Sequence, residues 1–334
     1  MDTRPITLDM QNQIERIRLE NGGIASPFSF ASLYIWRDIV GDRIHLEEEL
    51  FSLRYDAAAS EDPKKDYDAG ESEDPKKDYE AEDNGDLTLS TDKNHGATDL
   101  GESNENAWIF PCGSDEAKRR FITECLSKNH ALFYYVREED KTFLEENFLG
   151  RFQITPQDDF DEYIYSLKEQ TEIKGDKFHR IRNRINKLSK EHDLRTEILN
   201  DDNLSDAISV IENWARDKEI VGNLGTRGDE VDEDALKMHK ELKITGVIIY
   251  DGTKPISVAA GFYMSEDIYD VFLCKGAERI PGLFYHTRRE LLKTLNESCM
   301  RVDLEDDMGL EGLRTMKEEL HPIDKIKMWK AISV

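Results

Sequence analysis

The chain is poor in three features that mark common protein classes: paired cysteines, long apolar runs and basic charge. Its 4 cysteines are scattered, without the spacing of a zinc site or a disulfide framework, so the sequence predicts reduced thiols and no metal site. No stretch approaches the roughly 18 apolar residues that cross a bilayer, and the N-terminus lacks the apolar core of a secretion signal. The sequence therefore predicts a cytoplasmic protein without an integral membrane segment.

Acidic residues outnumber basic ones by 71 to 45, which gives the 334-residue chain a net charge of −26. Residues 56–106 alone contribute −12, with 17 acidic and 5 basic residues. The octapeptide Ser-Glu-Asp-Pro-Lys-Lys-Asp-Tyr occurs there twice, at 60–67 and at 72–79. This segment has too few apolar residues to offset the entropy lost on ordering, so it predicts a disordered insert. The overall charge argues against indiscriminate binding to nucleic acid. It does not argue against binding through a local basic surface.

Outside the insert, the hydrophobic periodicity predicts two α/β units with one order of elements: strand, two helices, three strands, helix, strand, helix, strand. We expect domains at 1–160 and 161–334, each with a mixed central sheet flanked by helices. In the second half the elements are predicted at 193–199, 204–217, 231–243, 246–250, 255–264, 268–274, 282–296, 300–304, 309–320 and 325–332. In the first half they are predicted at 5–7, 8–20, 28–38, 43–47, 50–55, 107–111, 114–127, 131–136 and 138–148, and closing strands at 151–154 and 162–165.

Three adjacent carboxylates, Glu305, Asp306 and Asp307, follow the strand predicted at 300–304. In open α/β sheets, ligands bind outside the carboxyl ends of the strands. Like charges so close together repel one another, a cost that a purely structural turn could avoid. We therefore predict that Glu305 and Asp307 recognise an ammonium group or relay a proton. The alternative is a solvated turn that caps the following helix.

The one concentration of basic charge is the segment 174–190, which holds seven Lys or Arg residues and a single acid, Asp176. At helical spacing its basic side chains lie opposite an apolar stripe. Such a helix could hold the phosphates of tRNA or coenzyme A, or it could be a surface helix that pairs with the acidic remainder. The candidate donor-binding residues here are Lys177, Arg180, Arg182, Arg184 and Asn186.

Three motifs resemble the family that contains the C-terminal domain of bacterial phosphatidylglycerol lysyltransferase and its soluble relatives, which have a tandem GNAT-like acyltransferase fold. The motif residues are Ser29, Phe30, Leu33, Ile35, Trp36 and Arg37; Lys174, Gly175, Lys177, Phe178, His179, Arg182, Asn183, Ile185, Asn186 and Lys187; and Glu305, Asp307, Gly309, Gly312, Leu313, Arg314, Lys317, His321 and Pro322. The resemblance implies transfer of an aminoacyl or acyl group to an amine or hydroxyl acceptor, with aminoacyl-tRNA as the donor in the best-known branch. It leaves a small molecule, a peptide or a lipid as the acceptor.

Departures from the family pattern bear on the substrates. Asp303 stands where Asn is expected, Leu188 where an aromatic residue is usual and Leu320 where Tyr is common, so the acceptor pocket is expected to differ. In the loop where acetyltransferases bind pyrophosphate, Phe284 replaces a small residue that would let backbone amides approach the phosphate. This change counts against acetyl-coenzyme A as the donor. Weaker candidates for carbonyl or phosphate contacts are Lys275, Arg279, Arg314 and Lys317.

No Ser-His-Asp or catalytic cysteine signature occurs, so transfer would depend on a neutral nucleophile and a group that removes its proton. The leading interpretation is an acyltransferase with its site in the second domain and with the first domain as a degenerate scaffold. Two others stay open. One is a non-catalytic binding or regulatory protein that keeps the fold, and the other is an acyl-coenzyme A N-acyltransferase that acts on a small amine.

Overall fold

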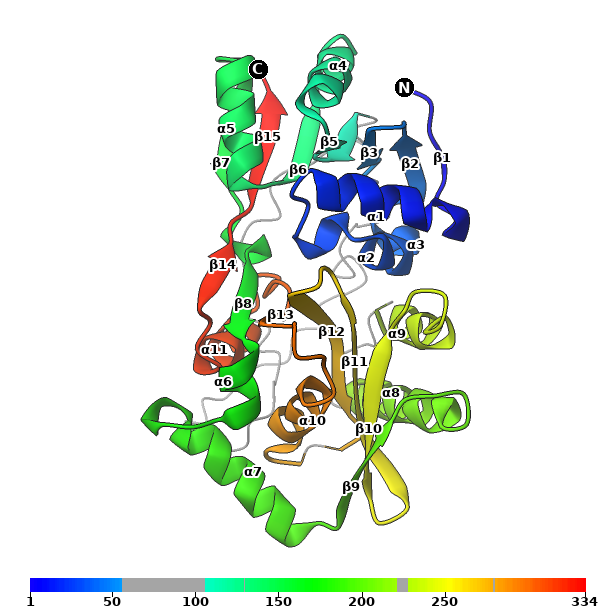
Figure 1. The fold of residues 1–334 in the computed structure, drawn as a ribbon, viewed down its shortest axis with the longest axis vertical. Helices are drawn as coiled ribbons and strands as arrows, with labels where there is room; N and C mark the ends of the chain where they lie inside the picture. Colours follow the sequence, from blue (N-terminus) through cyan, green and yellow to red (C-terminus); the bar gives the residue numbers. More distant parts are fainter. Residues whose placement is uncertain (56–105, 129, 221–227, 279) are drawn as a thin grey trace, which may run out of the picture.

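The computed structural model describes residues 1–55, 106–128, 130–220, 228–278 and 280–334, and the side chains of 217–220, 228 and 229 are not described. The insert that the sequence predicts to be disordered, 56–106, lies outside the described residues except for Asn106. The first half of the chain forms the upper part of the molecule in Figure 1 and most of the second half forms the lower part.

Two four-stranded sheets build the first half. One has the order β1 (Arg4–Pro5), β2 (Arg43–Leu46), β3 (Leu50–Leu53), β5 (Cys112–Gly113). The other has the order β4 (Ala107–Ile109), β6 (Leu132–Val136), β15 (Trp329–Ser333), β7 (Phe152–Pro156). The helices are α1 (Gln11–Glu20), α2 (Phe30–Ile35), α3 (Arg37–Val40), α4 (Asp115–Leu126) and α5 (Glu138–Asn147).

A seven-stranded sheet forms the second half. Its order is β14 (Asp324–Ile326), β8 (Glu162–Ser166), β13 (Arg301–Asp303), β12 (Ile268–Gly276), β11 (Lys254–Tyr263), β10 (Thr245–Asp251), β9 (Leu194–Ile198). The helices around it are α6 (Leu167–Glu172), α7 (His179–Glu191), α8 (Leu204–Ile220), α9 (Gly228–Lys237), α10 (Leu283–Leu292) and α11 (Glu311–Glu319). Short 3-10 turns lie at Leu8–Met10, Ser26–Phe28, Asp158–Phe160 and Asp176–Phe178.

The predicted fold class is confirmed, since mixed sheets are flanked by helices throughout the described chain. The second half follows the predicted order of strands and helices from β9 to β14. Local signals explain several boundaries. For example, the Ser114 hydroxyl accepts a hydrogen bond from the Ala117 backbone amide and so caps α4, whose first turn carries two acids that favour a helix N-terminus.

The two halves exchange strands, which the sequence did not indicate. The segment predicted at 162–165 to close the first unit is β8, which pairs with β13 and β14 in the second sheet. The single strand predicted at 325–332 is two strands, and β15 lies between β6 and β7 in the first half. Asp161 links the segment before β8 to the segment before β15. Its carboxylate accepts a hydrogen bond from the Met328 amide at 3.0 Å and forms an ion pair with Lys327. The division at 160/161 stays a prediction.

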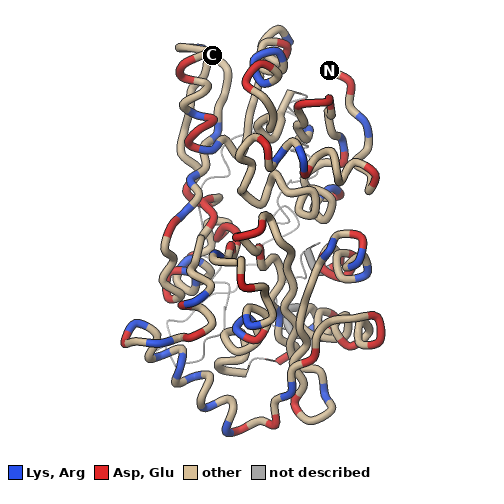
Figure 2. Tube along the Cα trace, viewed as in Figure 1, with Lys and Arg blue, Asp and Glu red and all other residues tan. Residues whose placement is uncertain are grey.

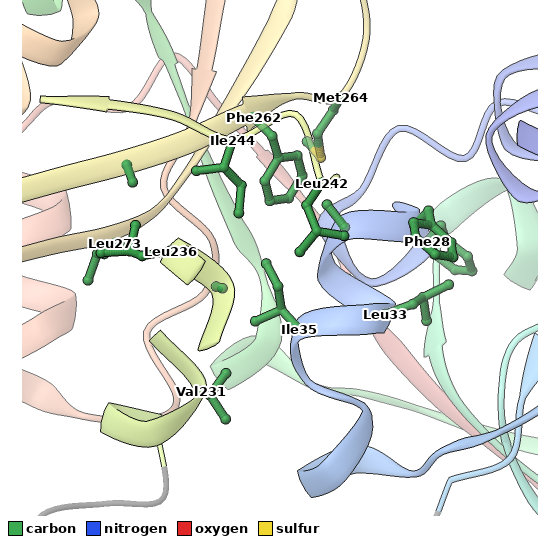
Figure 3. Close-up of a cluster of buried hydrophobic side chains, with 14 of the residues drawn as sticks. Phe28, Leu33, Ile35, Val231, Leu236, Leu242, Ile244, Phe262, Met264 and Leu273 are labelled. Carbon is green, nitrogen blue, oxygen red and sulfur yellow. The ribbon is translucent and has the colours of Figure 1, made fainter. Parts of the chain in front are cut away.

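One hydrophobic core crosses from half to half. Phe28 and Leu33 of the first half belong to the same buried cluster as Phe262 and Met264 of the second (Figure 3). The buried Arg18 of α1 joins the halves further, because it donates to the carbonyl oxygens of Gly23 at 2.9 Å and Met264 at 2.5 Å. The halves therefore pack on each other through apolar surface as well as through exchanged strands.

Candidate active site

Carboxylates gather where β12 and β13 part. The two strands run parallel and pair over three residues, of which the last pair is Asp270 with Asp303. Beyond this point β12 continues to Gly276, whereas the chain after Asp303 turns into a loop. A register shift in β11 lies opposite, at Gly261, where an added Cβ would come within 2.0 Å of the Asp270 carbonyl oxygen. Glycine is therefore needed for this close approach.

Three buried carboxylates meet at this point. Asp270 and Asp303 are 0% exposed. Within the described residues neither oxygen of Asp270 has a hydrogen-bond partner, whereas the Asp303 carboxyl shares a hydrogen bond with Glu162. Glu162 of β8 accepts a hydrogen bond from the Ser26 backbone amide at 3.0 Å and is also buried. Burial raises the pKa of Asp303 to about 6. Burial and neighbouring negative charges hold the pKa values of Glu162 and Asp270 well above their ordinary range.

Glu305 is the partly exposed member of this group. Its backbone lies in the left-handed region at φ 59°, and its amide donates to Asp303 Oδ1 at 2.8 Å. Within the described chain, the Glu305 carboxylate has no hydrogen-bond partner. Burial, followed by the negative charge of Asp306, raises the pKa of Glu305 to about 8. A carboxylate in this state can take up a proton near neutral pH.

Asp307, the other predicted catalytic residue, lies in different surroundings. It is fully buried and accepts hydrogen bonds from Tyr163 at 2.6 Å, from the Gly309 amide at 2.9 Å and from Arg314 Nε at 2.8 Å. Burial alone would raise its pKa, but these donors outweigh burial and hold the pKa below its ordinary value. Arg314 also bonds Asp159 at 2.7 Å. The structure thus brings Asp307 and Arg314 together as an ion pair. This pair stabilises the loop 304–310 between β13 and α11, which we call the acidic loop.

Lys317 of α11 is also used inside the loop. Its side chain is buried, and its ammonium group donates to the carbonyl oxygens of Leu304, Glu305 and Asp306, the Glu305 oxygen lying at 3.0 Å. Burial lowers its pKa, while the surrounding carboxylates oppose that shift. The positive charge of Lys317 therefore lies close to Glu305, Asp306 and Asp307 and offsets part of the repulsion among their carboxylates.

The predicted basic helix is α7, and its apolar stripe is confirmed by the burial of Ile181, Ile185 and Leu188. Figure 2 shows Lys and Arg recurring along α7, while Asp and Glu gather around β13. Three of the predicted donor-binding residues are exposed: Lys177, Arg180 and Asn186. Lys177, Arg182 and Arg184 have partners in the protein. Lys177 pairs with Glu169 at 2.8 Å, Arg182 donates to the Ile173 and Gly175 carbonyls, and Arg184 pairs with Glu319 at 3.2 Å.

Lys275, at the end of β12, forms an ion pair with Asp232 of α9 and lies 3.9 Å from the centre of the Trp214 ring. The charge of Asp232 also acts on Glu305, so this pair borders the carboxylates. The remaining candidate, Arg279, lies outside the described residues. No cluster of His, Cys, Asp and Glu in the described parts of the chain is arranged to hold a metal ion.

Residues 84–332 match the family described as phosphatidylglycerol lysyltransferase, C-terminal. The chain belongs to this family. Membership indicates an acyltransferase and leaves the donor and the acceptor open. No curated protein matches the chain. No helix within the described ranges has the length and apolar character needed to cross a membrane.

Solved structures resemble the chain at low sequence identity. A conserved protein of unknown function from Bacteroides thetaiotaomicron VPI-5482 is 18% identical with a TM-score of 0.78, and the match covers 100% of both chains. The L-PGS from Bacillus licheniformis is 14% identical with a TM-score of 0.49, over 68% of this chain and 77% of that one. A tandem GNAT protein from the clavulanic acid biosynthesis pathway is 10% identical with a TM-score of 0.39, over 65% and 69%. The Bacteroides protein shares the fold of this family member along its whole length.

Sequence reasoning missed Glu162 and Asp270. Each is a single acid in an otherwise apolar or aromatic strand, Glu162 before Tyr163 and Ile164, and Asp270 between Tyr269 and Val271. Burying a charged side chain in a strand costs free energy, so an isolated acid in such a strand indicates a functional residue. This was the sequence signal that could have identified both residues. Nothing in the sequence showed that the two would meet, because they lie on strands separated in the sheet by β13.

Proposed function

We propose that this chain is an acyltransferase that moves an aminoacyl or acyl group to an amine acceptor, with Glu305 taking the proton of the acceptor. The observation that carries the proposal is the state of the Glu305 carboxylate: partly exposed, without a hydrogen-bond partner in the described chain, and with a pKa of about 8. General bases work best when their pKa lies near the working pH. The surrounding carboxylates favour an acceptor that arrives as a cation.

The proposed step conserves atoms and charge. The acceptor ammonium first loses a proton to the Glu305 carboxylate, and the neutral nitrogen then attacks the carbonyl carbon of the donor. A C–N bond forms and the C–O or C–S bond to the donor breaks. As the amide forms, the nitrogen releases its second proton to water, and the proton held by Glu305 passes to the leaving oxygen or sulfur, which restores the carboxylate; the net reaction releases one proton. Asp307, Arg314 and Lys317 position the loop in this scheme, since their charged groups already bind one another or the loop backbone.

For the donor we propose aminoacyl-tRNA, with acyl-coenzyme A as the alternative. The family is described by a lysyl transfer, which supports an aminoacyl group. Exposed Arg180, Asn186 and Lys187 on α7 are the candidates for phosphate contacts. A charged-tRNA donor would also place the reaction in the cytoplasm. The acceptor is proposed as a small amine, a peptide or the head group of a lipid, with the transfer site in a second domain at 161–334.

The test is a transfer assay with the purified chain, in which charged tRNAs and acyl-coenzyme A thioesters are screened against amine acceptors and the products are weighed by mass spectrometry. Glu305→Gln should lower the rate at saturation at least tenfold, while Glu311→Gln, an exposed acid on α11, should not. The rate of the parent should rise with pH up to about 8, because the base must be deprotonated. A Glu305→Gln variant as active as Glu311→Gln would refute the role of Glu305.

A further inference from the structure

Tyr135 of the first half has a backbone that strands rarely contain. It lies in β6, yet its φ is 55°, in the left-handed region. The pairing of β6 with β15 shifts register here, since Trp329 pairs with Val136 but Ala331 pairs with Phe133. A bulky residue at positive φ costs free energy, and bulges often redirect a side chain beside an active site. The bulge therefore raises the question of what the redirected ring of Tyr135 reaches.

The ring contacts the segment that leads into β8. It meets the Phe160 ring edge-on, with centroids 5.8 Å apart and planes at 81°. Phe160 lies next to Asp159, the partner of Arg314, and two residues before Glu162. The negative charges that act on Tyr135 include those of Asp306, Glu162 and Glu305, with Tyr55 as a further neighbour. Tyr135 is thus a residue of the first half on which the charges of Asp306 and Glu305 act.

The hydroxyl of Tyr135 is an uncharged donor in these surroundings. Burial, with help from the nearby acids, holds its pKa well above the ordinary value, so the hydroxyl keeps its proton. Across the described residues the hydroxyl has no hydrogen-bond partner, and the side chain is partly exposed. The cations Lys317 and Arg314 already donate to the loop backbone and to Asp307. Glu162 and Glu305 are charged neighbours of both Tyr135 and buried Asp270, and within the described chain neither oxygen of Asp270 has a hydrogen-bond partner.

We propose that Tyr135 belongs to the transfer site and that its hydroxyl donates a hydrogen bond to the carbonyl oxygen of the acyl donor. The inference rests on the proposed function. Negative charge develops on that oxygen during attack, and the surrounding carboxylates would repel it. A neutral O–H donor held by a strained backbone stabilises this charge without reorganising. The first half then contributes chemistry to the site as well as support.

The test compares two tyrosines that are adjacent in β6. Tyr135→Phe keeps the ring and its contact with Phe160 and should lower kcat/KM by roughly 10- to 100-fold with an unchanged melting temperature. Tyr134→Phe is the matched control, since its buried hydroxyl also lacks a hydrogen-bond partner in the described residues, and it should stay within about twofold of the parent. Equal activities of the two variants, in a chain whose activity Glu305→Gln abolishes, would overturn the inference and leave the proposed function standing.

A second measurement needs no substrate. In a chain labelled with ¹³C at tyrosine Cζ, the Tyr135 resonance should shift with a midpoint near pH 8 as Glu305 ionises, and Glu305→Gln should remove this step. Ionisation of Asp306 is expected to add a separate step near pH 6. The Tyr134 resonance should lack the upper step. If the Tyr135 resonance lacks the step near pH 8, the inference is overturned. If the parent protein shows this step but has no transfer activity, the proposed function is refuted and Tyr135 still lies beside the loop.

Discussion

At the residue scale, two neighbouring carboxylates of one loop have opposite surroundings. Asp307 is surrounded by donors, which hold its pKa below the ordinary value, whereas burial among like charges raises the pKa of Glu305 to about 8. Acid and base roles in enzymes are commonly separated in this way. We therefore expect Asp307→Asn to loosen the loop, while Glu305→Gln removes the proton acceptor.

The raised pKa of Glu305 predicts a pH dependence of stability. The ordinary pKa of this carboxyl, which applies to the unfolded chain, is 4.5, and its pKa in the folded chain is about 8. Between pH 4.5 and pH 8 the folded protein therefore holds a proton that the unfolded chain releases. The free energy of unfolding should therefore fall as the pH rises from about 4.5 to 8. Asp270 and Glu162 act in the same direction.

Removing this carboxyl should reverse its share of the effect. Calorimetry should show that Glu305→Gln raises the melting temperature at pH 8.5, where the folded parent holds a buried charge. The variant should change the melting temperature little at pH 4.5, where the folded carboxyl is neutral and the unfolded one is only half ionised. Glu311→Gln, on the surface, serves as the control. A gain of equal size at both pH values would contradict the assignment of the raised pKa to Glu305.

At the scale of elements, α7 carries basic charge on one side and packs its apolar stripe on the other. Inward contacts use Arg182 and Arg184, whereas Arg180 and Lys187 face solvent. Basic residues on one helix therefore divide into a group that holds the fold and a group that is free to meet a ligand. Replacing Arg184 would confuse the two effects, because its partner Glu319 also binds Tyr285 at 2.7 Å.

The exposed pair gives the cleaner variant. Arg180→Gln combined with Lys187→Gln should weaken binding of charged tRNA and reduce the slope of log affinity against log salt by roughly 1.5, because two phosphate contacts are lost. Lys237→Gln combined with Lys240→Gln is the control, since it removes the same charge from exposed positions at the end of α9 and three residues beyond it. Filter binding at several salt concentrations checks this. If the salt dependence of affinity falls by the same amount in both double variants, α7 is not a specific phosphate-binding surface and the effect reflects the net charge of the protein.

At the scale of the whole molecule, strand exchange makes each half depend on the other. The C-terminal strand β15 completes the sheet between β6 and β7, and Ala331 is 0% exposed in the core of the first half. The bulge at Tyr135 is formed against this strand. The geometry of the proposed site therefore depends on the C-terminal strand.

Ala331→Asp should destabilise the protein by about 3 kcal/mol or more, since it buries an unpaired charge in the middle of β15. Hydrogen exchange should show the loss of protection in β6 and β7, far from the substitution in sequence. Ser333→Asp, at the partly exposed end of the same strand, is the control and should cost far less. Protection that persists in β6 and β7 would mean that the first half folds without the C-terminal strand.

The sequence by itself determined the α/β class, the order of strands and helices from β9 to β14, the family and the place of the acidic loop. These depend on local signals: periodicity along α7, the Ser114 cap and three consecutive carboxylates after a strand. Only the tertiary structure decided that β15 crosses into the first half, that Glu162 and Asp270 join Asp303, and that Arg182, Arg184 and Lys317 face inward. The reason is physical: local patterns set the conformation of a segment, whereas strand pairing, burial and the resulting pKa values depend on contacts between residues far apart in the chain.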